Sequence, residues 1–169
     1  SVIRVSGPEA FDIASIFCDL PDVGRIGLRA VRGCDGALID RAVVLCFENG
    51  ASFTGERVVE FQVHGGLATV ARLLSELSAQ KGCRLAEPGE FTRRALENGQ
   101  LDLNQVEALS DLIDAETESQ RQQAIRVLDG SFGDAGERWR GKLLRAAALL
   151  EASIDFSDEE IPDDLSVEV

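Results

Sequence analysis

The clearest pattern of apolar and polar positions along the chain is the alternation over residues 57–64. One face of this segment is apolar and consists of Val59, Phe61 and Val63. The other face is polar and consists of Glu60, Gln62 and His64. Because successive side chains of a β-strand point to opposite faces, the alternation predicts a strand that buries one face in a core.

Three further segments are strand-like, namely residues 2–5, 25–32 and 37–47. The Asp35-Gly36 pair between the last two is typical of a hairpin turn, which would place these strands side by side. Residues 83–86 form one more short predicted strand. The first part of the chain therefore contains the strands of a small sheet.

Helical periodicity separates these strands. Ser6-Gly7-Pro8-Glu9 has the spacing of a capping box and predicts a helix over about residues 8–18. Gly65-Gly66 opens a second predicted helix, which ends at Gly82, and its apolar stripe consists of Leu67, Val70, Ala71, Leu74 and Leu77. A third helix is predicted to begin at Pro88. The order β-α-β-β-β-α-β-α predicts the α+β class, a mixed α/β sandwich of sheet and helices.

After Gly99 the pattern becomes purely helical. Asp102, with Gln105 three residues on, predicts the start of a helix that continues to Asp129. Its expected buried positions are Val106, Leu109, Ile113, Ala124 and Leu128. A second helix over about residues 134–154 carries Trp139, Leu143, Ala147, Leu150 and Ile154 at helical spacing. Two long antiparallel helices cannot cover apolar stripes on both sides, so we expect an incomplete helical bundle, completed by further chain or a second subunit.

The pattern therefore predicts two domains, residues 1–99 and 100–169. The chain opens at Ser1 within an apolar, strand-like stretch, so we expect it to be part of something longer. The acidic segment from Asp158 is expected to be either a solvated helix end or a linker.

Charge limits what the chain can bind on its own. The formal net charge is −13, from 17 basic and 30 acidic residues. Eight acids and no base follow Arg145, namely Glu151, Asp155, Asp158, Glu159, Glu160, Asp163, Asp164 and Glu168. The rest of the chain is still acidic, which excludes a broad basic surface for nucleic-acid phosphates in this chain alone.

Cysteine and histidine usage argues against a zinc site. The four cysteines, Cys18, Cys34, Cys46 and Cys83, are widely spaced, and the chain has a single histidine. No apolar run is long enough to span a bilayer, and the start lacks the regions of a signal peptide. We therefore expect a reduced, cytoplasmic setting and no membrane partner.

Two glycine motifs were tested for phosphate binding. Gly50-Ala51-Ser52-Phe53-Thr54-Gly55-Glu56-Arg57 has the glycine spacing of a P-loop but lacks its Lys-Ser/Thr pair, so it is rejected. His64-Gly65-Gly66 stands where a strand meets a helix. Its N–H groups could receive an anion beside His64, or the glycines could simply form a tight turn with His64 in a structural hydrogen bond. The second alternative is favoured.

Glu60 is the strongest candidate for chemistry, because it stands between apolar neighbours on a predicted strand. An enclosed carboxylate needs a cation or hydrogen-bond donors, and Arg4, among apolar strand residues, could supply the cation. The pair could be structural, or it could line a cleft in which Arg4 binds an anion and Glu60 binds a donor–donor edge. Arg93 and Arg94 are interpreted as ordinary helix surface.

Several long motifs carry a family resemblance. They are Ser52-Phe53-Thr54-Gly55-Glu56, Val59-Glu60-Phe61-Gln62-Val63-His64-Gly65-Gly66, Glu87-Pro88-Gly89-Glu90-Phe91-Thr92-Arg93-Arg94-Ala95, Leu101-Asp102-Leu103, Ile113-Asp114-Ala115-Glu116-Thr117 and Ile154-Asp155-Phe156. Together they resemble, in collinear order, the MnmE (TrmE) family of bacterial tRNA-modification GTPases. The resemblance covers nearly the whole chain.

The resemblance implies a fold and ligands. Residues 1–99 would be a domain similar to folate-dependent aminomethyltransferases that binds formyl- or methylene-tetrahydrofolate and forms a homodimer. Residues 100–169 would be the first part of the central helical domain. GTP, magnesium and potassium would belong to a GTPase domain that these residues do not contain, so this chain alone would lack GTPase activity.

Three positions carry the family's folate contacts, namely Arg4, Glu60 and Gln100. The first two match the family, whereas Gln100 stands where the family usually has a basic residue. The family's basic residue could pair with the glutamate tail of the folate, and Gln100 lacks that charge. Either the affinity for folate is therefore weaker, or Arg93 or Arg94 substitutes. No catalytic residue is assigned, and no role carries over to His64.

The resemblance also implies partners. The full-length family proteins work with the flavoprotein MnmG (GidA) to modify the wobble uridine of certain tRNAs in the cytoplasm. Two alternatives stay open at this point. The chain could be a structural dimerisation scaffold with a vestigial pocket, or a stand-alone folate-dependent aminomethyltransferase-like protein.

Overall fold

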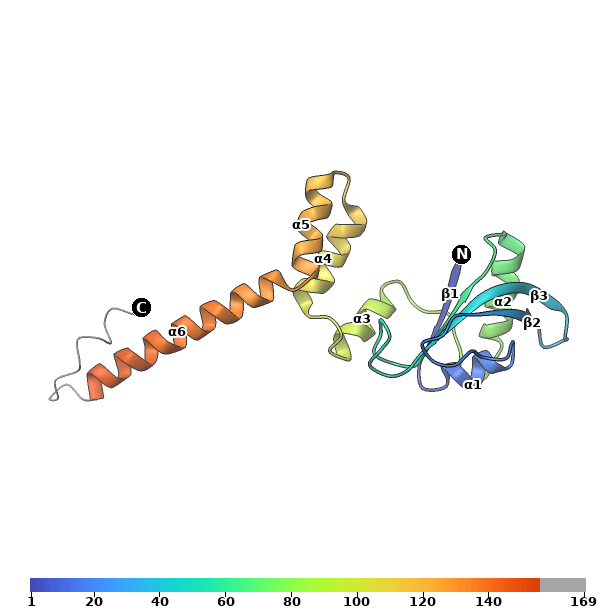
Figure 1. Ribbon diagram of the computed structural model, residues 1–169, viewed down its shortest axis with the longest axis horizontal. Helices are drawn as coiled ribbons and strands as arrows, with labels where there is room; N and C mark the ends of the chain where they lie inside the picture. The colour runs from blue at the N-terminus through green and yellow to red at the C-terminus, as the bar shows by residue number, and fades with distance from the viewer. Residues whose placement is uncertain (156–169) are drawn as a thin grey trace. The chain divides into compact units, whose positions relative to one another are not determined.

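The computed structural model describes residues 1–155, and the chain divides into two compact units, Ser1–Asp102 and Leu103–Val169. The acidic segment from Asp158 lies outside the described residues. The elements of the first unit are, in order, β1 (Val2–Ser6), α1 (Ala10–Ser15), β2 (Gly27–Arg32), β3 (Leu38–Phe47), β4 (Val58–Gln62), α2 (Leu67–Ser78) and α3 (Glu90–Glu97), as labelled in Figure 1.

The four strands form one antiparallel sheet in the order β1-β4-β3-β2. The predicted turn at Asp35-Gly36 joins β2 to β3, and Gly36 has a φ of 77°, a conformation that favours glycine. In the pairing of β1 with β4, Arg4 lies directly opposite Glu60. The sheet with its helices confirms the predicted α+β class.

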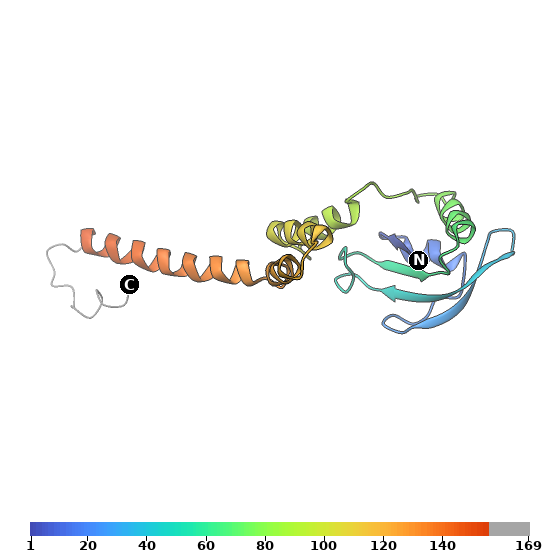
Figure 2. The same ribbon diagram turned by 90° about the horizontal axis from the view of Figure 1, so that it is seen from above.

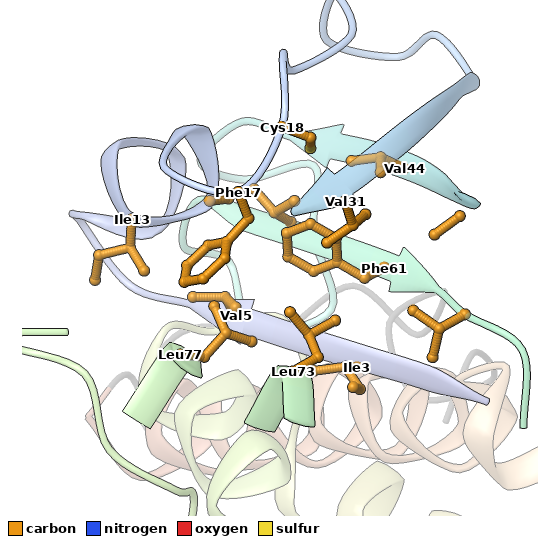
Figure 3. Close-up of a cluster of buried hydrophobic side chains, with 14 of the residues drawn as sticks. Ile3, Val5, Ile13, Phe17, Cys18, Val31, Val44, Phe61, Leu73 and Leu77 are labelled. Atoms are coloured by element: carbon orange, nitrogen blue, oxygen red, sulfur yellow. The ribbon is translucent and has the colours of Figure 1, made fainter. Parts of the chain in front are cut away.

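The core fills one face of this sheet. Ile3 and Val5 of β1 and Phe61 of β4 point to the same side as the buried residues of α1 and α2 (Figure 3). Phe17, Phe61 and Leu73 are almost completely buried there. Since Ile3 and Val5 of β1 and Val59 and Phe61 of β4 belong to this core, Arg4 and Glu60, which alternate with them, project from the opposite face of the sheet.

The helices of the first unit differ from the prediction at two places. α1 begins at Ala10, and Ser6 does not cap it, because the Ser6 hydroxyl contacts Thr54 and Glu56 instead. In α2 the predicted stripe was partly wrong. Leu67 is 89% exposed, whereas Leu73, which the prediction omitted, is completely buried.

The strand predicted over residues 83–86 is wrong, because this segment belongs to no helix or strand. A β-strand exists only through its ladder to a neighbour, and the sheet contains only β1 to β4 within the described residues. Arg84 instead projects from this extended segment to Glu90 of α3.

The second unit consists of α4 (Leu103–Asp114), α5 (Glu118–Leu128) and α6 (Ser131–Asp155) over the described residues. The single helix predicted from Asp102 to Asp129 is therefore wrong, because it is two helices that pack against each other. The Thr117 hydroxyl accepts a hydrogen bond from the Gln120 N–H, and the Gln120 side chain accepts one from the Thr117 N–H. This capping box starts α5 anew.

Thr117→Ala is expected to lower the free energy of unfolding by about 1 kcal/mol, because it removes the side-chain acceptor of the cap. Circular dichroism during a urea titration measures this loss. Ser110→Ala is the matched control, since Ser110 is exposed within α4 and caps nothing. Equal stability of the two variants would show that the cap contributes nothing.

α6 forms one continuous helix, as Figure 2 shows, and it exposes its apolar residues. Trp139, Leu143 and Leu150 are 62%, 71% and 65% exposed in the part of the chain that the structure describes. The predicted stripe thus exists but faces solvent rather than a core. Within residues 1–155, no helix combines the length and apolar character that crossing a membrane requires.

Candidate functional site

The structure brings Arg4 and Glu60 together on the open face of the sheet. Arg4 Nε donates a hydrogen bond to Glu60 Oε1 at 2.6 Å. The Glu60 side chain is only 15% exposed, whereas the Arg4 side chain is 47% exposed. Neighbouring apolar residues enclose the carboxylate, while part of the guanidinium faces solvent. This geometry is typical of a charge-assisted pair that keeps free binding capacity.

Two cavities have Arg4 in their walls. A small one of about 60 Å³ is lined by Arg4 and Glu60 together with Phe53 and Phe91. A larger one of about 640 Å³ lies beside β1 and is lined by Arg4, Phe91 and apolar residues of α2, including Val70 and Leu74. Arg4 and Phe91 line both cavities.

Gln100 lies elsewhere. Its N–H donates to the carbonyl of Ala95 at 2.8 Å, and its side chain lies against Gly55. Among the described residues it lines neither cavity. Gly55 has a φ of 76°, and a Cβ there would come within 3.1 Å of Asn98 and Gln100, so this close approach requires glycine.

A network of charged groups, which the sequence analysis did not identify, joins α3 to the residues before it. Glu90 is 4% exposed and accepts hydrogen bonds from both Arg84 and Arg94. The bonds from Arg84, from the Glu87 N–H and from Arg94 hold the pKa of Glu90 well below its usual range. Interpreting Arg94 as ordinary helix surface was therefore wrong.

The network continues from Arg94 to β1. Arg94 Nη1 lies 3.0 and 3.1 Å from the two carboxylate oxygens of Glu56. The Ser6 hydroxyl donates to Glu56 at 2.7 Å and also contacts Thr54, which is completely buried. The only signal in the sequence was the pair of long motifs that contain Glu56 and Glu90. Glu56 and Arg94 are 38 residues apart, and a single sequence does not reveal that two such distant residues pair.

His64 takes the structural role that was favoured for it. Its backbone N–H donates to Asp40 Oδ2, and its Nδ1 lies 2.8 Å from Asp40 Oδ1. Burial opposes ionisation of Asp40, but the hydrogen bonds from the His64 backbone and ring outweigh it, so the pKa of Asp40 is lowered. The backbone N–H and the ring Nδ1 of His64 thus both bind Asp40 of β3 and are not left to bind an anion.

The cysteines form no disulfide among the described residues. Burial raises the pKa of Cys18 to about 11, so this thiol stays protonated at neutral pH. In the same part of the chain, no group of three or more His, Cys, Asp or Glu side chains could hold a metal ion.

The fold and the site together define an α+β domain followed by a helical domain, and comparisons with known families give both a description. Residues 1–100 match the family described as "GTP-binding protein TrmE N-terminus", and residues 103–169 match "MnmE helical domain". The chain therefore belongs to the MnmE (TrmE) family.

Curated relatives carry the name tRNA modification GTPase MnmE. The protein of Roseobacter denitrificans is 59% identical and that of Ruegeria pomeroyi 58% identical, each over the whole of this chain. The protein of Caulobacter vibrioides is 50% identical over 98% of the chain. The chain spans about 40% of the length of the first two relatives and 37% of the third.

Proposed function

We propose that this chain is the folate-binding and dimerising part of a tRNA-modification GTPase. The names of its relatives support the whole-protein activity, and the matches over residues 1–100 and 103–169 support the assignment of both parts. In this proposal Arg4 and Glu60 contact a formyl- or methylene-tetrahydrofolate, which supplies the one-carbon unit when bound, and Gln100 stands at the position of the family's third contact.

The Arg4–Glu60 pair carries the proposal. The amino–imino edge of a reduced pteridine offers two parallel donors, which suit a carboxylate that is 15% exposed and held from one side. The Nη nitrogens of Arg4 have no hydrogen-bond partner among the described residues and can donate to ligand acceptors. The residues present therefore fit the group.

The larger cavity offers space for the rest of such a ligand. The larger cavity, at about 640 Å³, falls within the roughly 300–1,000 Å³ typical of small-molecule sites. Its wall from Val70 and Leu74 is apolar, as a p-aminobenzoyl group would require. Arg4 lines both cavities and can contact either part of the ligand.

The glutamate tail of the ligand lacks a charged partner at position 100, because Gln100 carries no charge and lies against Gly55. Arg94 is committed to Glu90 and Glu56 and is not free to replace a basic residue. Arg93 is exposed and meets only Glu87, at 3.8 Å. In this proposal Arg93 therefore pairs with the tail carboxylates.

The remaining assignments concern the whole protein. These 169 residues contain no P-loop lysine motif. GTP hydrolysis, with magnesium and potassium, would therefore take place in a GTPase domain outside them. The homodimer would act with the flavoprotein MnmG on the wobble uridine of tRNA in the cytoplasm. This chain alone would not hydrolyse GTP.

Calorimetric titration of 5-formyltetrahydrofolate into the 169-residue chain tests the folate site. Glu60→Ala is expected to weaken binding by roughly 10- to 100-fold, because hydrogen bonds to charged groups contribute about 1.5–3 kcal/mol. Gln62→Ala is the matched control, since Gln62 points from the same face of β4 but lines neither cavity. Equal binding by wild type and Glu60→Ala would remove Glu60 from the site.

A dimerisation scaffold without a working folate site is the second candidate, and the position of Gln100 away from both cavities favours it. Light scattering on the calorimetry samples separates the two functions. A scaffold would form a dimer and give no heat with the folate, whereas the proposed site binds the folate in a dimer.

A further inference from the structure

The loop of residues 52–56 presents one aromatic side chain and hides its neighbours. Ser52 and Thr54 are buried, and the Ser52 hydroxyl donates to the Glu56 carbonyl at 2.6 Å, which closes the loop on itself. Phe53 between them is 41% exposed. Its ring lines the small cavity together with Arg4 and Glu60. The hydrogen bonds of the loop therefore hold Phe53 outward.

A second aromatic side chain reaches the same cavity from α3. Phe91 is half-buried, and it lines both cavities. Arg94 follows three residues later, so it lies on the same side of the helix as Phe91. A contact that holds Arg94 therefore also holds the turn of α3 that carries Phe91.

The contact between Arg94 and Glu56 is the direct link between these two parts. Both carboxylate oxygens of Glu56 lie within 3.1 Å of Arg94 Nη1. Glu56 is in turn bound by Ser6 of β1, and Arg94 is bound by the buried Glu90. Each end of the link is thus held by a second contact, and the link itself has little freedom to move.

We infer that Glu56 and Arg94 are positioning residues, which set the separation of Phe53 and Phe91 beside the Arg4–Glu60 pair. The inference rests on the proposed function, because the ligand held there has a flat ring, such as the pyrimidine ring of a reduced pteridine. Aromatic rings bind a flat partner only at a defined spacing and offset. A shift of the loop relative to α3 would change that spacing without touching Arg4 or Glu60.

Calorimetry with 5-formyltetrahydrofolate on Glu56→Gln, Phe53→Ala and the double variant tests this inference. Phe53→Ala is expected to weaken binding about 10-fold. Glu56→Gln, which keeps the shape and loses the charge, is expected to weaken it about 5-fold. If Glu56 acts through the position of Phe53, the double variant binds no more weakly than Phe53→Ala alone.

Glu76→Gln is the matched control. Glu76 of α2 also pairs with an arginine, Arg72, and its side chain is 15% exposed against 24% for Glu56, but it lines neither cavity. Its substitution is expected to leave folate binding unchanged. Arg94→Lys, which keeps the charge and loses the planar guanidinium, provides a second route to the same measurement should Glu56→Gln unfold.

The outcomes separate the inference from the function on which it rests. Unchanged binding by Glu56→Gln, or losses that simply add in the double variant, would overturn the positioning role while wild-type binding upholds the folate site. A wild-type chain that gives no heat with the folate would overturn both. Thermal midpoints equal to that of Glu76→Gln show that a loss of binding is not a loss of fold.

Discussion

Phe61→Ala is expected to lower the free energy of unfolding of the first unit by about 3–5 kcal/mol, the usual range for removing a buried aromatic ring. Phe61 of β4 has no exposed surface and belongs to the cluster of buried side chains that Figure 3 shows. Its loss leaves a cavity that the close-packed residues around it cannot fill. A loss of this size is comparable with the whole stability of a small domain.

Phe53→Ala is the matched control for that prediction. The same ring is removed, but Phe53 is 41% exposed and belongs to no part of the core. Urea titrations of both variants, followed by circular dichroism, measure the two losses. If Phe53→Ala destabilised the chain as much as Phe61→Ala, the core around β4 would not be the source of the stability.

The sequence predicted β4 well because its pattern is local. Alternation alone places Phe61 of β4 on the buried face and Glu60 on the open one. In β1 it likewise places Ile3 and Val5 on the buried face and Arg4 on the open one. The pairing of Arg4 with Glu60 followed from the need of an enclosed carboxylate for a cation. These predictions needed no knowledge of how distant segments meet.

Predictions failed where a distant partner competed with a local one. Ser6 has good spacing to cap the first helix, but Thr54 and Glu56, about fifty residues away, take its hydroxyl. Arg94 looked like helix surface because its partner Glu56 stands 38 residues earlier. Propensity and spacing describe neighbours along the chain, whereas such contacts depend on the fold.

One failure had a local signal. Thr117 and Gln120 have the spacing of a capping box, which predicts a new helix start inside the segment taken as one long helix. Helical periodicity continued across this break and concealed it. By contrast, nothing local distinguishes residues 83–86 from a strand, because only the absence of a neighbouring strand decides against it.

Glu90→Gln is expected to lower the thermal midpoint more than any other exchange of a carboxylate for its amide in the first unit. Glu90 stands at the centre of the network, since Arg84, Arg94 and the Glu87 N–H all donate to it. An amide offers one acceptor oxygen in place of two and turns an N–H group toward a guanidinium. Removing one partner of an enclosed ion pair leaves the others unpaired.

The effect of Glu90→Gln should depend on pH in a defined direction. The pKa of Glu90 is lowered in the folded chain, chiefly by the hydrogen bond from Arg84, whereas the unfolded value is about 4.3. A lowered pKa stabilises the fold above the unfolded value, and this contribution is lost as the pH falls further. The difference in thermal midpoint between wild type and Glu90→Gln should therefore be largest at pH 7 and become smaller from about pH 4 downward.

Glu87→Gln is the control for the charge itself, because Glu87 lies three residues earlier, is 69% exposed and meets only Arg93 at 3.8 Å. Its midpoint should follow that of wild type at every pH, since an exposed pair contributes about 0–1 kcal/mol. Other carboxylates with lowered pKa values, such as Asp35 and Asp40, titrate alike in wild type and variant and cancel in the comparison. A gap for Glu90→Gln that stayed constant from pH 7 to pH 3 would assign the loss to packing rather than to the ionised carboxylate.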